Sequence, residues 1–144
     1  MKTITNQQII DLGITPRMCV EWIRESFRMK YEAQLPTKIS LHPQGSDFIN
    51  TMPCLLPERY GRFGVKVVSR IAGQKPSLHS DILLYNSKTG ELLSLLEADW
   101  ITQMRTGAVA ALAIETLQKT EAQIYSFIGL GSTAQATMMC IQAI

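Results

Sequence analysis

The sequence of 144 residues has little of what marks several protein classes: 3 cysteines, 7% aromatic residues and 18% charged residues. Cys19, Cys54 and Cys140 are odd in number and far apart, so they favour neither a disulfide scaffold nor a zinc box. We expect them to be buried, reduced thiols, and we assign no chemistry to the isolated His42 and His79. The sequence therefore predicts no metal site.

Long apolar runs and an excess of one charge are also absent. The longest apolar run, residues 108–114, is far shorter than the ~20 residues that span a membrane. Lys and Arg total 14 against 12 Asp and Glu, so nothing electrostatic favours a nucleic-acid or membrane partner. The start turns polar after Ile4, without the apolar core of a signal peptide. We expect a cytoplasmic, globular chain.

Two helices are predicted near the start. Thr5-Asn6-Gln7-Gln8 fits a capping box, and Gly13 follows a short apolar run as a helix C′ glycine. Thr15-Pro16 places an N-cap before a proline at the first helical position. Cys19, Ile23, Phe27 and Tyr31 then recur every four residues, which predicts an amphipathic helix to about Tyr31 with this stripe in the core.

The middle of the chain changes to short β-type runs. These runs, at residues 38–41, 48–52, 62–69, 78–85 and 92–96, are separated by turn-forming segments, with a hairpin loop at residues 86–90. Successive strands without intervening helices indicate an antiparallel or mixed sheet in an α+β unit. Asp99 is then predicted to cap a helix from about Trp100 to Lys119, and the small residues in the middle of this helix, around Gly107, predict close approach of another backbone.

The most informative motif lies near the end of the chain. Residues 124–128 have a buried-strand pattern, Gly129-Leu130-Gly131-Ser132-Thr133-Ala134 follows, and residues 135–144 have a helical pattern. Strand, G-x-G-x-x-A and helix in that order form the first turn of a dinucleotide-binding fold. Gly129 permits the tight turn, Gly131 lets the backbone approach a pyrophosphate, and Ala134 permits close packing.

The acidic residue that holds the ribose in this fold lies ~20 residues beyond the glycines, past residue 144. We therefore expect a truncated Rossmann domain and, for residues 1–144 alone, poor cofactor binding and no activity.

From about Lys38 onward the sequence resembles the ornithine cyclodeaminase/μ-crystallin family. The matching segments are Met52-Pro53, Gly64-Val65-Lys66-Val67-Val68-Ser69, the stretch from Thr89-Gly90 to Arg105-Thr106-Gly107-Ala108, and Gly129-Leu130-Gly131. The resemblance implies an α/β chain with a substrate-binding and dimerisation domain at residues 1–120. The start of a Rossmann domain would follow at residues 121–144. It also implies NAD or NADP as cofactor, an amino acid or cyclic imine as substrate, and a homodimer.

The resemblance also implies the site residues. Lys66 and Arg105 match positions that hold the substrate carboxylate, Lys38 stands where arginine is more frequent, and Ser77 matches a hydroxyl position near the substrate. The cofactor-binding residues implied are Gly129, Gly131, Ser132, Ala134 and Gln135.

One residue departs from the pattern of the cyclodeaminases, which convert ornithine to proline and ammonia by hydride transfer and return. Where they carry a glutamate proposed for acid/base work, this sequence has Asn50, whose amide cannot exchange a proton near neutral pH. The departure leaves open a ketimine reductase or an amino-acid dehydrogenase of the same family. A non-catalytic, μ-crystallin-like binding protein is a further alternative.

Overall fold

The computed structural model describes all 144 residues, which form two compact units. The first, here called the sheet unit, comprises Met1–Ile9 and Met29–Asp99; the second, the helical unit, comprises Ile10–Arg28 and Trp100–Ile144. Along the sequence, segments of the two units alternate, and the two segments of the helical unit flank Met29–Asp99. The domain division at residue 120, which the resemblance implies, stays a prediction.

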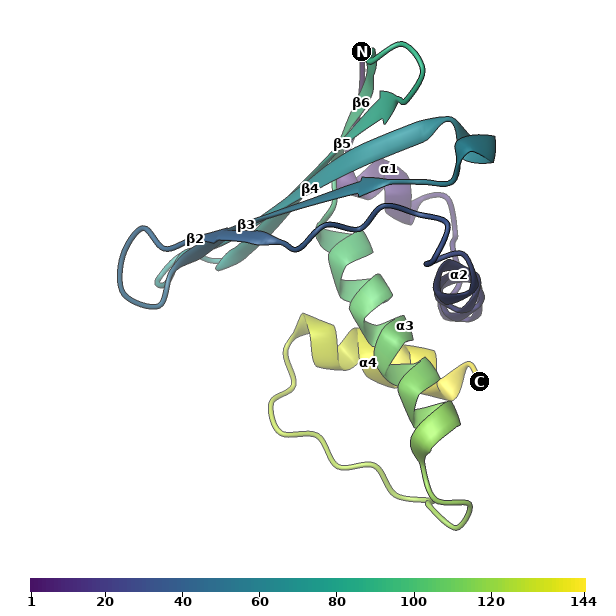
Figure 1. The fold of residues 1–144 in the computed structure, drawn as a ribbon. Coiled ribbons are helices and arrows are strands. Elements are labelled where there is room, and N and C mark those ends of the chain that lie inside the picture. The colour runs from purple at the N-terminus through teal and green to yellow at the C-terminus, as the bar shows by residue number, and fades with distance from the viewer. The chain divides into compact units, whose positions relative to one another are not determined.

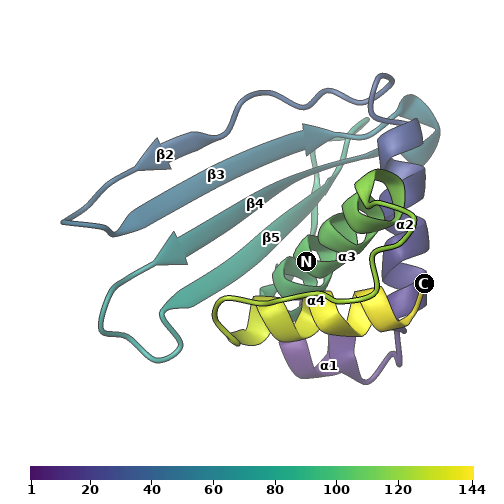
Figure 2. The ribbon, with the colours of Figure 1, turned by 90° about the horizontal axis from the view of Figure 1, so that it is seen from below.

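Six strands form one sheet in the sheet unit (Figures 1 and 2). The strands are β1 (Lys2–Ile4), β2 (Ile39–Leu41), β3 (Phe48–Leu55), β4 (Arg62–Arg70), β5 (Leu78–Asn86) and β6 (Leu92–Glu97), in the order β1-β6-β5-β4-β3-β2. All neighbours are antiparallel except β1 and β6, which are parallel. This confirms the mixed sheet and the five predicted strands, whereas β1 was not predicted.

The register divides the strand residues between two faces of the sheet, because successive side chains point to opposite sides. The Lys66 face carries Ser40, Asn50, Met52, Cys54, Gly64, Lys66, Val68, Ser80, Ile82 and Leu96. The Val67 face carries Ile39, Leu41, Ile49, Thr51, Phe63, Val65, Val67, Leu83, Tyr85 and Leu95. The buried strand residues Val68, Ser80 and Ser94 all belong to the Lys66 face.

The hairpin loop between β5 and β6 is confirmed. The Asn86 side-chain oxygen accepts hydrogen bonds from the backbone N–H groups of Lys88 (2.9 Å) and Thr89 (3.3 Å). Gly90 closes the loop at φ +74°, a conformation that favours glycine, and its N–H donates to the carbonyl of Asn86. Local side-chain bonding therefore fixes the turn.

The predicted helix starts are also confirmed. Before α1 (Asn6–Ile10), Thr5 and Gln8 exchange the two hydrogen bonds of a capping box, at 2.9 and 3.2 Å. Before α2 (Pro16–Arg28), the Thr15 hydroxyl accepts a hydrogen bond from the N–H of Met18 at 3.2 Å.

The end of α2 differs from the prediction. The helix stops at Arg28, before Tyr31, and Tyr31 is 92% exposed. Phe27 is also exposed, so the predicted core stripe is wrong in its second half and holds for Cys19 and Ile23. Periodicity identified the apolar side of the helix. However, the core residues of the helical unit contact this side only as far as Ile23.

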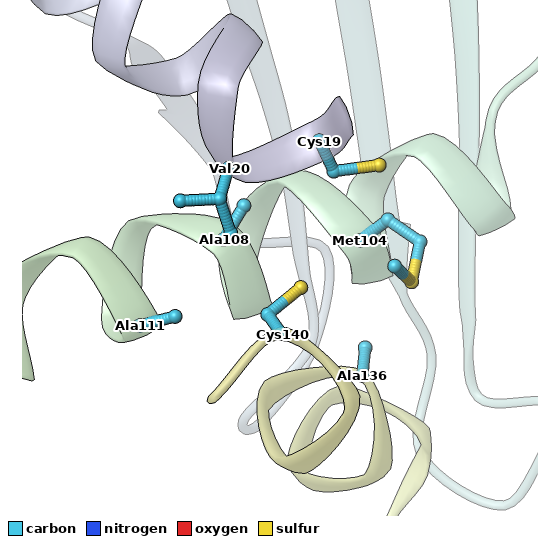
Figure 3. Packing of buried hydrophobic residues seen from close by; sticks show 7 residues of the cluster. All are labelled: Cys19, Val20, Met104, Ala108, Ala111, Ala136 and Cys140. Atoms are coloured by element: carbon cyan, nitrogen blue, oxygen red, sulfur yellow. The ribbon is translucent and has the colours of Figure 1, made fainter. Parts of the chain in front are cut away.

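Small side chains fill the core of the helical unit, where α2 packs with α3 (Asp99–Leu117) and α4 (Ser132–Gln142). Figure 3 shows this core, formed by Cys19, Val20, Met104, Ala108, Ala111, Ala136 and Cys140. A Cβ added to Gly107 would lie 2.6 Å from the backbone carbonyl carbon of Ala136. The predicted close approach of a second backbone at Gly107 is therefore confirmed, and the approaching element is α4.

The predicted strand at residues 124–128 is not formed. These residues pair with no other strand and have no regular structure, and Ile124 and Ile128 are exposed. A strand needs a neighbour for its backbone hydrogen bonds, whereas α4 forms its bonds within itself. This explains why the predicted helix is present at Ser132–Gln142 and the strand before it is absent.

Candidate functional site

Lys66 is the central candidate in the sheet unit. It lies half-buried on β4, in register with Met52 of β3 and Ile82 of β5. Its row continues through Leu96 of β6 to Ile4 of β1, so among the paired strand residues of this row Lys66 is a cation with apolar neighbours. The apolar neighbours cover part of the Lys66 side chain, and attraction to an anion is stronger where water is partly excluded.

Lys38 shares this row. Ile39 is paired with Thr51, and the same register continued by one residue sets Lys38 opposite Met52, whose other neighbour is Lys66. The two lysines are thus two strand spacings apart, roughly 10 Å between backbones. Lys38 is exposed. Lys38 thus lies just outside the paired residues of β2, next to the level of the sheet at which Lys66 lies.

Ser77 is placed elsewhere in the sheet unit. It is exposed in the loop between β4 and β5, and its carbonyl accepts a hydrogen bond from the N–H of Ile71 at 2.9 Å. The adjacent pair Arg70 and Leu78 lies four residues along β4 from Lys66, roughly 13 Å away. The sheet does not bring Ser77 to Lys66, so its role near the substrate stays a prediction.

Asn50 is half-buried on the Lys66 face, next to Met52 in the alternation of β3. The hydroxyl of Ser40 on β2 donates a hydrogen bond to Asn50 Oδ1 at 2.7 Å. The two residues are directly opposite each other in the register, so the bond joins neighbouring strands. An amide therefore occupies the position for which the cyclodeaminase resemblance implies a glutamate.

Arg105 is the candidate cation of the helical unit. It is exposed on α3 and forms no ion pair within the chain. Desolvation by the surrounding protein atoms lowers the pKa of Arg105, although an arginine stays protonated in a protein. The Arg105 guanidinium group is thus always charged and incompletely hydrated. Its planar arrangement of N–H donors suits bidentate binding of a carboxylate.

The glycine-rich turn before α4 has the conformation that its sequence predicts. Gly129 has φ +88°, which a residue with a Cβ rarely adopts. Gly131 is the N-cap of α4 in an extended conformation, and no atom lies within 4 Å of where its Cβ would be. The backbone of this turn is thus open to close approach by a ligand.

The first turn of α4 provides donors for an anion. The first hydrogen bond of the helix runs from the N–H of Gln135 to the carbonyl of Gly131 at 3.0 Å, so the three preceding amides have no helical acceptor. Ser132 is exposed and Ala134 half-buried. The Gln135 side chain donates to the carbonyl of Leu130 at 3.2 Å and braces the turn. These groups fit the diphosphate of a dinucleotide.

Two serines of the Lys66 face were missed by sequence reasoning. Ser40 was detectable, because polar Lys38 and Ser40 alternate with apolar Ile39 and Leu41, which places both on one face. Ser80 had no comparable signal. Its hydroxyl oxygen is buried without a hydrogen-bond partner, and only the register shows that it lies in the row of Asn50 and Val68.

The ornithine cyclodeaminase/mu-crystallin family model matches residues 2–144, nearly the whole chain. The chain belongs to this family. One similar relative is alanine dehydrogenase of Archaeoglobus fulgidus, which is 28% identical over 137 residues and is aligned with 91% of this chain and 41% of its own. The recognised family and the α/β fold are thus both confirmed.

Two solved structures of the family have the same architecture. The Δ1-pyrroline-2-carboxylate reductase of Thermococcus litoralis, in complex with NADH and L-proline, is 28% identical and superposes with a TM-score of 0.90 over 99% of this chain. An archaeal alanine dehydrogenase dimer with bound NAD is 25% identical, with a TM-score of 0.86 over 97% of this chain.

The chain spans less than half the length of these relatives, 46% of the reductase chain and 44% of the dehydrogenase chain. None of its helices combines the length and apolar character needed to cross a bilayer. A location in the cytoplasm stays a prediction.

Proposed function

We propose that this chain supplies the substrate-binding sheet and the first cofactor-binding turn of an NAD(P)-dependent oxidoreductase of amino acids or their imines. The observation that carries the proposal is the turn before α4. There, Gly129 at φ +88° and the open backbone at Gly131 leave the first amides of the helix available to a diphosphate. The NADH and NAD complexes of the two structural relatives support it.

From the family resemblance, we assign Lys66 and Arg105 to binding of the substrate carboxylate. Lys66 is a half-buried cation among apolar side chains, and Arg105 provides a fork without an internal ion-pair partner. Lys38 adds a second ammonium to the Lys66 row. An α-carboxylate is common to every amino acid and imino acid, so this part of the site fixes the class of substrate and not its side chain.

The reaction is reversible hydride exchange at the carbon that carries the nitrogen. The amino acid loses a hydride from its Cα to the oxidised nicotinamide, which accepts it when the cofactor is bound, and a proton from its nitrogen leaves to form the imine. In the reverse direction the imine is protonated and takes up the hydride. The residues described here orient the carboxylate, and none of them is assigned the proton transfer.

Asn50 favours a dehydrogenase or an imine reductase over an ornithine cyclodeaminase. Cyclodeamination adds attack by the side-chain amine and loss of ammonia, and both steps require further proton transfers. Asn50 cannot exchange a proton near neutral pH. Hydride exchange alone requires fewer proton transfers than cyclodeamination does. This agrees with the activities named for the alanine dehydrogenase and the pyrroline-2-carboxylate reductase.

The test is turnover by the protein expressed from its complete gene. We expect reduced nicotinamide absorbance to appear with L-alanine or L-proline and to disappear with Δ1-pyrroline-2-carboxylate or with pyruvate and ammonium. NAD and NADP are compared in parallel, because the residues described here do not distinguish them. Absence of hydride exchange with every amino acid and imine tried would contradict the proposal and favour a binding protein.

As part of the same proposal, the Val67 face joins two copies of the chain in a homodimer. Phe63 and Tyr85 stack there with ring centroids 4.5 Å apart, and Ile39 and Leu41 at the sheet edge are about 60% exposed, at 62% and 58%. A broad apolar face of this kind is costly to leave in water. The dehydrogenase dimer among the relatives supports the assembly.

Val67→Glu tests this interface, because it puts a charge at the centre of the face. We expect sedimentation velocity to show monomers where the wild type shows dimers. Val67→Thr, which keeps the shape, should remain dimeric. A dimer that withstands Val67→Glu would place the interface elsewhere.

A further inference from the structure

The glycine-rich turn is joined to α4 by hydrogen bonds from one residue, Gln135. The backbone N–H of Gln135 donates to the carbonyl of Gly131 at 3.0 Å, and its side-chain Nε2 donates to the carbonyl of Leu130 at 3.2 Å. Because a carbonyl oxygen only accepts hydrogen bonds, the NH2 group of Gln135 is the group that faces Leu130. Residues 126–131 form no other hydrogen bond, so both bonds that hold the turn against the helix come from Gln135.

The side-chain bond sets the direction of a neighbouring amide. The peptide between Leu130 and Gly131 is trans and planar, so the N–H of Gly131 points opposite to the carbonyl of Leu130. Since that carbonyl is turned toward the Gln135 side chain, the Gly131 N–H is directed away from it. No atom of the chain accepts a hydrogen bond from this N–H or from those of residues 132–134. The bond from Gln135 therefore orients the first of four free amides.

Without the Gln135 side chain, this peptide has little to keep it from turning over. Rotation by half a turn would change φ of Gly131 from −68° to a positive value, which glycine adopts readily and other residues avoid. No heavy atom outside the neighbouring residues lies within 4 Å of the place where a Cβ of Gly131 would be, so packing does not oppose the rotation. The reversed peptide would present the Leu130 carbonyl oxygen in place of an N–H, and the partial negative charge of that oxygen repels an anion.

The helix α4 itself does not depend on the Gln135 side chain. Ala136 and Cys140 of α4 are 4% and 0% exposed in the core of the helical unit (Figure 3), whereas Gln135 is exposed. The backbone of Ala136 also lies against Gly107 of α3. Replacing Gln135 with another helix-forming residue therefore changes the turn and leaves the helix in place.

We propose that Gln135 is a positioning residue, which locks the peptide between Leu130 and Gly131 so that the Gly131 N–H joins the free amides of α4 as a donor to the cofactor diphosphate. The lock holds this peptide in its donor orientation before the cofactor binds, so no affinity is lost in turning it. The Gln135 side chain thus acts on the cofactor through the backbone. This inference rests on the proposed function and concerns the cofactor part of the same site.

The experiment measures dissociation constants with the protein from its complete gene, by nicotinamide fluorescence for NADH and by competition for ADP and adenosine. Gln135→Met keeps the length of the side chain but cannot donate to a carbonyl. We expect it to raise the Kd of NADH and of ADP about fivefold and to leave the Kd of adenosine, which lacks the diphosphate, unchanged. The kcat at saturating cofactor should also stay at the wild-type value, because only the binding of the diphosphate is weakened.

Gln142→Met is the matched control, because Gln142 is an exposed glutamine at the other end of α4 and should leave every Kd unchanged. A wild-type Kd of NADH in Gln135→Met would overturn the inference. Equal losses of ADP and adenosine affinity would also overturn it, since they would mean that the variant disturbs the whole domain. Absence of NADH binding by the wild-type protein would contradict the proposed function and this inference with it, whereas an unmoved Kd in Gln135→Met contradicts this inference alone.

Discussion

The sheet unit and the helical unit are stabilised in different ways. In the sheet unit few apolar residues are fully buried, namely Ile9, Pro57, Val68 and Ala98, and six strands are joined by backbone hydrogen bonds. The helical unit has a continuous core of seven buried residues, most of them small, with helix backbones in direct contact at Gly107. The sheet unit thus depends mainly on backbone pairing between strands, whereas the helical unit depends on the close fit of small side chains.

The largest expected effect comes from the same substitution made in each unit. Gly107→Ala would place a methyl group 2.6 Å from the backbone of Ala136, where no side chain can move aside, and we expect a loss of about 3 kcal/mol in unfolding free energy. Gly64→Ala on β4 would place its Cβ 3.1 Å from the carbonyl oxygen of Leu83. A shift of a few tenths of an ångström relieves that contact, so the change should stay within about 1 kcal/mol.

Thermal and denaturant unfolding of the two variants measure this difference. Equal losses for Gly107→Ala and Gly64→Ala would mean that the helical unit adapts as readily as the sheet, and the contrast between the units would fail.

The next effect tests the two cations, one in each unit, that the family resemblance assigns to the substrate carboxylate. Arg105→Ala in the full-length enzyme should lower kcat/KM at least tenfold, about 1.4 kcal/mol, because the fork that binds the carboxylate is removed. Lys66→Met, which keeps the length of the side chain in the apolar row, should have a similar effect. Steady-state kinetics with the best amino acid measure both, and Arg28→Ala at the end of α2 is a control for loss of a surface charge. Unchanged kinetics for either variant would remove that residue from the site.

The smallest effect concerns the core of the helical unit. Burial, together with the nearby Cys19, raises the pKa of the Cys140 thiol from its ordinary 9.0 to about 11. Because the folded state holds this proton more tightly than the unfolded state, stability is complete below about pH 9 and falls as pH rises toward 11. We expect a loss of about 1 kcal/mol by pH 10.

Cys140→Ala removes the thiol with the large shift and should weaken this alkaline decline more than Cys54→Ala does, because burial also raises the pKa of the Cys54 thiol. The free energy of unfolding as a function of pH is the measurement. An unchanged decline in Cys140→Ala would assign it to another group.

Sequence reasoning succeeded where structure is local. The caps at Thr5 and Thr15, the loop at Asn86 and the turn at Gly129 each depend on a few adjacent residues, and each has the predicted conformation. The strands of the meander were also found, because each pairs with the strand next to it in sequence. For such elements the alternation of apolar residues and the turn residues are sufficient.

Sequence reasoning failed where an element depends on a distant partner. β1 has three residues and exists through its pairing with β6, some ninety residues away. The segment 124–128 has the composition of a buried strand but no partner within residues 1–144. In the site, Lys66 and Asn50 were noted from the family pattern, whereas the Ser40 contact with Asn50 required the register of β2 on β3.

The short pairing of β1 with β6 has a consequence for handling the protein. Residues 2–4 are what covers the outer edge of β6, whose sequence is the leucine-rich Leu92–Glu97. If a tag or deletion displaces them, β6 presents unpaired backbone groups and apolar side chains to other molecules, and such edges promote aggregation. Affinity tags on this protein are therefore safer at a distance from β1, and loss of solubility on deletion of residues 2–4 would reveal how much the three-residue strand protects.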